Sequence, residues 1–310
     1  MVRPIEGYDF RGLTLTFCLL AKIKYNIDIK PLEVIMNILV TIDQNYIKQL
    51  EVMMFSLRRH HPKEELDVYL LHEKIPEKAL KKLSETLQIV TINLHPIQID
   101  NQFFENFPIT ERYPYTMYYR LLAAHFLPDS VDRILYLDPD LVIINPIDEL
   151  YNIQFNGQFF AAATHVEKTL EKINQVRLNY SNGIYVNSGV LLMNTNLLRA
   201  EQDVDAIAHY VERFKDLLFL PDQDVLSALY PDKIIKIKAS QYNMTERMWV
   251  KEKVNQLGGK LEWIDENCHI IHFIGKNKPW LPNYFGDLDR YYIEAEGYLN
   301  GRLDAAKSSQ

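Results

Sequence analysis

"ILYLDPDLVIINPIDEL", residues 134–150, contains two apolar runs joined by a pair of aspartates, Asp138 and Asp140, with only a proline between them. The first run is typical of a buried strand in a parallel sheet. Two carboxylates at the mouth of such a strand repel each other and lose hydration. A divalent cation such as Mg²⁺ or Mn²⁺ would compensate for both effects, because carboxylate oxygens are its preferred ligands.

Two other interpretations of this stretch stay open on its residues alone. Asp-Pro-Asp is favourable turn chemistry, and a turn is the usual explanation of an isolated D-x-D. The string also has the pattern of haloacid-dehalogenase phosphatases, in which the two aspartates act as nucleophile and acid. The stretch therefore predicts a metal site, a turn or a phosphatase nucleophile.

Strands alternate with helices in the first half of the chain. Apolar patterns predict strands at 37–43, 66–72, 89–95 and 133–138, and helices from about 47 to Pro62, at 76–87 and at 116–127. This alternation predicts an α/β fold, a parallel sheet with helices on both faces. Ligands of such sheets bind beyond the carboxyl ends of the strands, and Asp43 and Asp138 end the first and fourth strands.

The second half of the chain is more mixed. Its patterns predict strands at 158–166, 184–194, 233–238 and 268–274, and helices at about 197–218, 221–230 and 287–299. We expect one continuous domain over 36–285, followed by a C-terminal helix and tail at 286–310. Residues 1–35 are expected to form an N-terminal extension, because "MNILVTIDQNY" from Met36 resembles the first strand of a domain.

Composition narrows the function classes. The 310 residues are 47% hydrophobic and 24% charged with a formal net charge of -7, and no run rich in Lys and Arg suggests a nucleic-acid surface. Two cysteines, Cys18 and Cys268, are too few for a disulfide framework, which favours a reducing compartment. The apolar run at 12–21 is shorter than the roughly 20 residues of a spanning helix. We therefore expect a cytoplasmic protein, or one at the inner face of the membrane, without a transmembrane segment.

Further candidate residues lie in "HIIHFIGKNKPW", residues 269–280. His272 is either a satisfied core histidine or a ligand. Gly275 permits close approach of the backbone to a ligand, and Lys278 offers a positive charge to a phosphate. The alternative is a tight turn with a solvated lysine.

Polar residues elsewhere interrupt apolar patterns. N-capping explains one of Asp222, Gln223 and Asp224 at the start of a helix, but not all three. Asn187 and Ser188 break an apolar strand, so they face a polar ligand or mark a bulge. Arg120, on an apolar helix, either reaches into the site or pairs with a surface acid.

Taken together, these motifs resemble glycosyltransferase family 8, which includes bacterial lipopolysaccharide galactosyl- and glucosyltransferases and glycogenin. The shared strings, in the family's order over about 36–280, are "ILVTIDQNY", "YYRLLAAHFLP", "ILYLDPDLVI", "YVNSGVLLMN", "DQDVL" and "HFIGKNKPW". The resemblance implies a GT-A fold with a Rossmann-like, mostly parallel sheet. It further implies retaining transfer of glucose or galactose from a UDP-sugar to a saccharide, glycolipid or glycoprotein acceptor in cell-surface polysaccharide synthesis.

The resemblance also implies roles for individual residues. The ligands of Mn²⁺, with Mg²⁺ as the alternative, would be Asp138, Asp140 and His272. The uridine and ribose contacts would be Thr41, Asp43, Asn45 and Tyr46, and the diphosphate contacts Gly275 and Lys278. The donor-sugar residues would be Arg120, Asn187, Ser188, Asp222 and Gln223.

Retention leaves two mechanisms to consider. We favour same-face substitution, in which Gln223 stabilises an oxocarbenium-like sugar, and Asp224 is the carboxylate to test as a covalent nucleophile. This chain has His165 where many relatives carry an acidic residue, so glucose and galactose both remain candidates. The rival functions are the phosphatase and a non-catalytic UDP-sugar-binding module.

Overall fold

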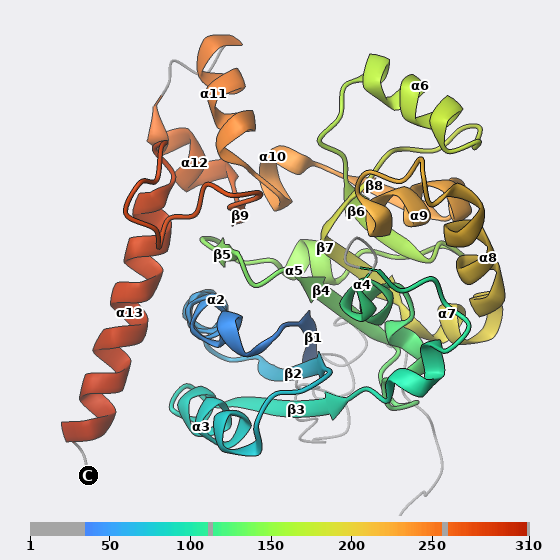
Figure 1. Ribbon diagram of the computed structural model, residues 1–310. Helices are drawn as coiled ribbons and strands as arrows, with labels where there is room; N and C mark the ends of the chain where they lie inside the picture. The colour runs from blue at the N-terminus through green and yellow to red at the C-terminus, as the bar shows by residue number, and fades with distance from the viewer. Residues whose placement is uncertain (1–34, 111–113, 256–259, 309–310) are drawn as a thin grey trace, which may run out of the picture. The chain divides into compact units, whose positions relative to one another are not determined.

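Within the residues that the computed structural model describes, 35–110, 114–255 and 260–308, a seven-stranded sheet has the order β3-β2-β1-β4-β7-β6-β8 (Figure 1). Its strands are β1 (Ile35–Thr41), β2 (Glu65–His72), β3 (Ile92–Gln98), β4 (Arg133–Leu137), β6 (Phe160–Ala163), β7 (Asn187–Asn194) and β8 (Ile234–Ile237). All neighbours pair in parallel except β7, which is antiparallel to both β4 and β6. The predicted mostly parallel sheet is confirmed.

A second, two-stranded sheet lies beside the first. Its strands β5 (Leu141–Ile143) and β9 (Ile270–His272) pair antiparallel, and Leu141 lies opposite His272. The second apolar run of the "LDPD" stretch therefore leaves the main sheet and pairs with a segment more than a hundred residues later. This pairing brings His272 to the end of β4.

Helices cover both faces of the main sheet, as predicted (Figure 1). One face is covered by α2 (Ile47–His60) and α3 (Glu77–Gln88), and α13 (Asp289–Ser308) packs against α2 and β5. The other is covered by α4 (Tyr115–Leu121), α7 (Thr195–Glu201), α8 (Val204–Phe214) and α9 (Pro221–Leu229). The shorter helices are α5 (Asp148–Tyr151), α6 (Lys168–Arg177), α10 (Ala239–Tyr242), α11 (Glu246–Asn255) and α12 (Leu261–Asn267), with 3-10 turns η1 (Gln44–Tyr46), η2 (Asn101–Phe104) and η3 (Ala123–His125).

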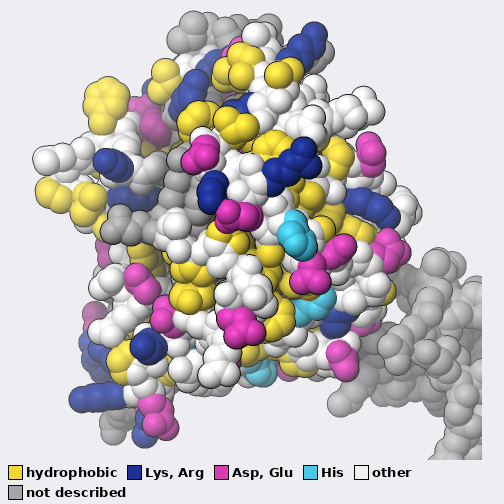
Figure 2. Space-filling model, turned by 45° about the vertical axis from the view of Figure 1, so that its right-hand side comes forward, with side chains coloured by type: hydrophobic (Ala, Val, Ile, Leu, Met, Phe, Trp, Pro, Cys, Tyr) yellow, Lys and Arg dark blue, Asp and Glu magenta, His cyan; other side chains and the backbone are white. Residues whose placement is uncertain are grey.

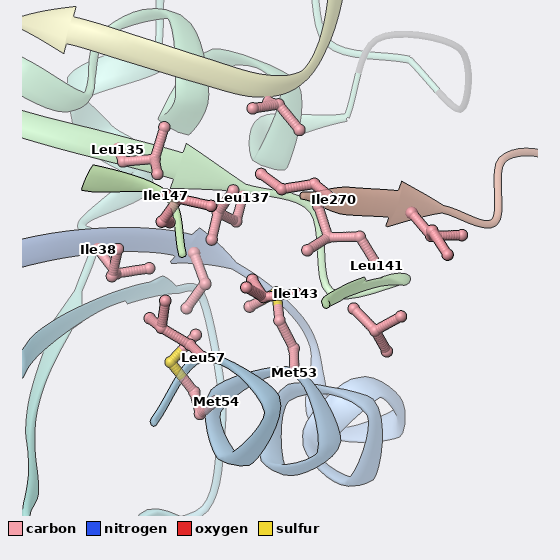
Figure 3. Close-up of a cluster of buried hydrophobic side chains, with 14 of the residues drawn as sticks. Ile38, Met53, Met54, Leu57, Leu135, Leu137, Leu141, Ile143, Ile147 and Ile270 are labelled. Carbon is pink, nitrogen blue, oxygen red and sulfur yellow. The ribbon is translucent and has the colours of Figure 1, made fainter. Parts of the chain in front are cut away.

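Side chains of each strand alternate between two cores. In β1, Ile38 joins the core under α2, whereas Leu39 joins the core under α4. Figure 3 shows Met53 and Leu57 of α2 packed toward Ile38, Ile143 and other apolar side chains of β1, β4, β5 and β9. The same core therefore fixes the ends of β4, β5 and β9, where the candidate metal ligands lie.

The structure corrects some predicted boundaries. The helix expected at 197–218 is two helices, because Gln202 is extended and its side-chain amide donates to the carbonyl of Leu121 at 3.0 Å. Asp203 then caps α8 by accepting from Ala206 N at 3.0 Å. The strand expected at 89–95 begins at Ile92, because Thr91 has a φ of 55° that ends the preceding turn.

Other sequence expectations have different outcomes. The helix expected at 116–127 is α-helical only to Leu121, and the C-terminal helix continues to Ser308, beyond the expected 299. Cys268 is buried and free, whereas Cys18, the apolar run at 12–21 and nearly all of the predicted extension lie outside the described residues. None of the helices within the described ranges is both long enough and apolar enough to cross a bilayer.

The surface view agrees with the mixed charge of the sequence. On the face in Figure 2, the coloured Lys and Arg side chains are interspersed with Asp and Glu. Among the described residues of that face there is no broad basic area of the kind that nucleic-acid-binding surfaces present.

Candidate active site

A cleft of about 420 Å³ lies at the carboxyl ends of β1 and β4. Its walls come from β1 and η1, from α4, from the turn after β4 and from the start of α9. The lining residues are Thr41, Ile42, Asp43, Tyr46, Pro114, Thr116, Met117, Arg120, Asp138, Pro139, Asp140, Pro221 and Asp222. The cleft therefore lies where ligands of open α/β sheets bind.

Asp138, Asp140 and His272 form one cluster beside this cleft. Their ligand atoms all lie within 4.8 Å of one another. His272 Nε2 is 3.1 Å from Asp140 Oδ1 and 3.7 Å from Asp138 Oδ2. Backbone hydrogen bonds hold the segments that carry these residues together. Asp138 N donates to the carbonyl of Gly189 at 2.8 Å, and Phe273 N donates to the carbonyl of Asp140 at 2.9 Å.

The donor set of this cluster suits a divalent cation. Two carboxylates and one imidazole combine the oxygen ligands that Mg²⁺ and Mn²⁺ prefer with a nitrogen that transition metals accept. Burial alone would raise the pKa of Asp140, but His272 and Lys278 outweigh it and hold that pKa well below its usual range. The Asp140 carboxylate is therefore ionised and available as a ligand at neutral pH.

Gly189 of β7 approaches the cluster more closely than any residue with a side chain could. A Cβ at this position would lie 2.2 Å from His272 Cε1 and 2.6 Å from Asp138 Oδ2. The glycine of "NSG" thus leaves room for two of the three candidate ligands.

Arg120 of α4 links three elements on one side of the cluster. Its guanidinium donates to Asp138 Oδ1 at 2.6 Å and to Ser188 Oγ at 2.9 Å, and it also pairs with Asp222 and bonds Tyr136. Burial alone would lower the pKa of Arg120, but Asp138, Tyr136 and Asp222 raise it above its usual value. Arg120 therefore stays charged and connects β4, β7 and α9.

Tyr136 was not predicted as part of the site. Its hydroxyl donates to Asp138 Oδ1 at 2.5 Å and lies 3.2 Å from Thr41 Oγ1. Burial, opposed by Arg120 and reinforced by Asp138, raises its pKa far above the usual value, so it remains a neutral donor. A hydroxyl in the apolar run "ILYL" was the available sequence signal.

The residues matched to the nucleotide lie partly in the cleft. Thr41, Asp43 and Tyr46 line it, and Asp43 caps η1 by accepting from Asn45 N at 2.7 Å. Asn45 itself is exposed. Burial, followed by the charges of Asp140, Asp43 and Asp138, raises the pKa of Tyr46, which therefore lies within electrostatic reach of the cluster.

The loop after β9 brings a cation to the cluster. Lys278 pairs with Asp140 and donates to the carbonyl of Phe273 at 2.7 Å. Gly275 has a φ of 76°, a left-handed conformation that favours glycine, and a Cβ there would meet open space. The loop therefore turns sharply between His272 and Lys278.

The three polar residues at the start of α9 have different surroundings. Asp222 lines the cleft and accepts from Ser188 Oγ at 2.6 Å. Gln223 is half-buried, and its carbonyl accepts from Ser227 Oγ at 2.6 Å. Asp224 is fully buried and accepts from Arg177 Nη2 at 2.7 Å.

Four residues from three segments donate hydrogen bonds to the Asp224 carboxylate. Besides Arg177, the donors are the hydroxyl of Tyr185 at 2.7 Å and the backbone N–H groups of Phe219 at 2.6 Å and Leu220 at 3.2 Å. These contacts tie the segment before α9 to α6 and thereby fix the direction in which Asp222 enters the cleft.

Asn187 differs from Ser188, its neighbour in the sequence. Ser188 bonds Arg120, whereas the side-chain oxygen of Asn187 accepts from Gly189 N at 3.1 Å and from Asn243 Nδ2 at 2.8 Å. Asn243 then contacts His272 Nδ1 at 2.9 Å. Asn243 carried no motif in the sequence, because its role depends on a segment that folds back from α10.

Comparisons with known proteins agree with this arrangement. The model of "Glycosyl transferase family 8" matches residues 37–283. "General stress protein A" of Bacillus subtilis is 25% identical over 255 residues, 80% of this chain and 88% of that protein. "Lipopolysaccharide 1,2-glucosyltransferase" of Escherichia coli K12 is 27% identical over 249 residues, 79% of this chain and 72% of that protein.

A solved structure shares the fold. The galactosyltransferase LgtC, in complex with donor and acceptor sugar analogs, aligns with a TM-score of 0.71 at 22% identity, over 84% of this chain and 95% of that one. The sheet and its helices therefore form a GT-A fold, as predicted. Because the family model covers most of the chain, the protein belongs to glycosyltransferase family 8.

Proposed function

We propose that this protein is a retaining, metal-dependent transferase that moves a hexose from a UDP-sugar to a saccharide acceptor. The observation that supports this most strongly is the cluster of Asp138, Asp140 and His272 at the carboxyl edge of the sheet, beside a cleft of about 420 Å³. In a family 8 chain, these residues would hold a divalent cation, which would neutralise charge on the donor diphosphate. Mn²⁺ is our first candidate, and Mg²⁺ is the second.

Each part of the site has a proposed role. A divalent cation would act as a Lewis acid and stabilise the negative charge of the departing UDP. Lys278 adds a second positive contact to the diphosphate, with Gly275 shaping the loop. The uridine and ribose lie against Thr41, Asp43, Asn45 and Tyr46.

In this proposal, the donor sugar lies against Arg120, Ser188 and Asp222. Arg120 and Ser188 hold Asp222 in place, so that its carboxylate can accept hydrogen bonds from sugar hydroxyls. Gln223 stabilises the oxocarbenium-like sugar, and the acceptor hydroxyl attacks the face that UDP leaves. Asp224 supports this geometry as a positioning residue, because its carboxylate is buried and surrounded by donors. Asn187 stays a candidate contact to the sugar, and its side-chain oxygen also accepts from Asn243 Nδ2 at 2.8 Å beside the metal site.

The relatives support a proposal for the acceptor class. A lipopolysaccharide 1,2-glucosyltransferase among them suggests a cell-surface oligosaccharide as the acceptor and glucose as the first donor sugar to test, with galactose second. Such a reaction uses cytoplasmic UDP-sugars, so we place the protein in the cytoplasm, where it meets its acceptor at the inner face of the membrane.

Donor hydrolysis without acceptor tests this function. The purified protein is incubated with UDP-glucose or UDP-galactose in Mn²⁺, Mg²⁺ or EDTA, and released UDP is measured. We expect release that depends on the cation and is lost in Asp140→Asn. The sugar first released should have the α configuration of the donor, by NMR. Equal release in EDTA would contradict the metal role, and cation-dependent cleavage of an aryl phosphate without UDP release would favour the phosphatase.

A further inference from the structure

A chain of buried polar groups runs from the backbone of β7 to the candidate metal ligand His272. Gly189 N donates to Asn187 Oδ1 at 3.1 Å, and Asn243 Nδ2 donates to the same oxygen at 2.8 Å. Asn243 Oδ1 then lies 2.9 Å from His272 Nδ1. The exposed fractions are 9% for Asn187, 0% for Asn243 and 2% for His272. Because they are buried, the two side-chain amides and Nδ1 of His272 need one another as hydrogen-bond partners.

The direction of every hydrogen bond in this chain follows from its first donor. A backbone N–H can only donate, so the side chain of Asn187 must present its oxygen to Gly189. That oxygen is an acceptor, so Asn243 must turn its NH₂ group toward Asn187. The oxygen of Asn243 therefore faces His272, and the imidazole must carry its proton on Nδ1.

This tautomer has a consequence on the other side of the ring. With Nδ1 bonded to Asn243, Nε2 is the ring nitrogen that faces the carboxylates, Asp140 Oδ1 at 3.1 Å and Asp138 Oδ2 at 3.7 Å, and a bound cation would replace any proton on it. If Asn243 presented its NH₂ group to the ring instead, Nε2 would carry the proton and could not bind a cation.

The backbone around Asn243 holds this amide in register with β9. Met244 N donates to the carbonyl of Ile270 at 3.0 Å, and His272 N donates to the carbonyl of Met244 at 2.7 Å. The carbonyl of Asn243 also lies 2.9 Å from Nε2 of His165. His165 therefore supports the segment that carries Asn243.

We propose that Asn243, oriented by Asn187, is a positioning residue that fixes His272 as the Nδ1-protonated tautomer and thereby makes Nε2 a cation ligand. This inference rests on the metal site of the proposed function. A hydrogen-bond acceptor on the outer nitrogen of a ligand histidine fixes the orientation of the ring and raises its basicity, and losing it typically lowers metal affinity about 10–100-fold.

Three variants separate this role from a general contribution to stability. Asn243→Leu removes the acceptor at similar volume. Asn243→Asp keeps an oxygen for Nδ1–H but places a second oxygen against Asn187, which should lower thermal stability. Asn145→Leu is the control, because Asn145 caps the carbonyls of Asp265 and Cys268 at 2.9 and 2.6 Å in the same part of the fold.

The first measurement is Mn²⁺ affinity of the nucleotide-free protein, from the electron paramagnetic resonance signal of free Mn²⁺. We expect Asn243→Leu to bind about 10–100-fold more weakly than the wild type, and Asn243→Asp to bind within a few-fold of it or more tightly. Asn145→Leu should bind like the wild type. Melting temperatures in EDTA show how stability changes in each variant. Affinity that follows melting temperature across all three variants contradicts the proposal.

The second measurement reads the tautomer directly. ¹⁵N NMR of the histidine-labelled wild type in EDTA should show His272 protonated at Nδ1, with His272→Gln identifying its signals. A His272 ring without a proton on Nδ1 overturns the proposal even if Asn243→Leu does not fold. Wild-type protein that has the expected tautomer but does not bind Mn²⁺ would instead contradict the metal site and leave the tautomer assignment standing.

Discussion

Replacing Gly189 by alanine should weaken cation binding strongly with only a moderate loss of stability. The added Cβ would lie 2.2 Å from His272 Cε1, whereas ordinary contacts begin at 3.4 Å, so the imidazole or the backbone must move by roughly 1.2 Å. The Cβ would also lie 2.6 Å from Asp138 Oδ2. Such overpacking costs about 1–3 kcal/mol of folding free energy.

The effect on the metal should be larger than the effect on the fold. Nitrogen and oxygen ligands lie about 2.0–2.2 Å from a bound cation, so moving His272 by roughly 1.2 Å and Asp138 by roughly 0.8 Å stretches or breaks both of their bonds to it. We expect Mn²⁺ affinity to fall by more than about 100-fold. Losing a hydrogen bond that supports a metal ligand typically costs about 10–100-fold, and disturbing the ligands themselves should cost more. Isothermal titration with Mn²⁺ and urea unfolding in EDTA measure the two quantities separately.

Gly297→Ala provides the matched control. Gly297 lies in α13, and a Cβ there meets nothing within 4 Å, so the same substitution should leave Mn²⁺ affinity unchanged and raise stability by about 0.5–1 kcal/mol. If Gly189→Ala binds Mn²⁺ as tightly as the wild type, the close approach of β7 to the ligands is wrong.

Three further predictions follow from the site and the cores. Asp140→Asn should lose Mn²⁺-dependent release of UDP, measured by a coupled assay, while it still unfolds cooperatively in urea; full activity would remove Asp140 from the metal site. Arg177→Met and Asp224→Asn should each lower kcat by loosening the start of α9, and mass spectrometry should find no glycosyl adduct on Asp224 of the wild type; a trapped adduct there would make it the nucleophile. Burial, followed by the charge of Arg59, lowers the pKa of His60 to about 4 from its usual 6.5. The unfolded chain therefore takes up this proton more readily, so the contribution of His60 to stability is complete above about pH 6.5 and is lost as the pH falls toward 4. Urea midpoints of His60→Gln should fall less over this range than those of the wild type, and an identical fall would refute the assignment.

The sequence was most informative where local pattern and tertiary position coincide. The run "ILYL" predicted β4, and the aspartates after it lie at the carboxyl edge because parallel strands end there. Parallel pairing and helices on both faces followed from the alternation of elements. The ligand role of His272, in contrast, came from family resemblance, since a histidine in an apolar strand has no distinguishing local pattern.

Features that depend on long-range contacts were missed. The break at Gln202 reflects its hydrogen bonds to Leu121 and Tyr230, which no local propensity encodes. The hydrogen bond between Asn187 and Asn243 was not predicted, because it depends on the turn after α10 that brings Asn243 to the end of β9. Hydrogen bonds between residues so far apart in the sequence can be identified only from the folded structure.

The central claim is that Asp138, Asp140 and His272 hold a cation through which the donor nucleotide binds. Its most direct test is calorimetric titration of the wild type with UDP, in Mn²⁺ and in EDTA, alongside Asp138→Asn in Mn²⁺. We predict that UDP binds the wild type in Mn²⁺ at least about 100-fold more tightly than in EDTA, and that Asp138→Asn in Mn²⁺ behaves like the wild type in EDTA. Equal UDP affinity under all three conditions would contradict the claim.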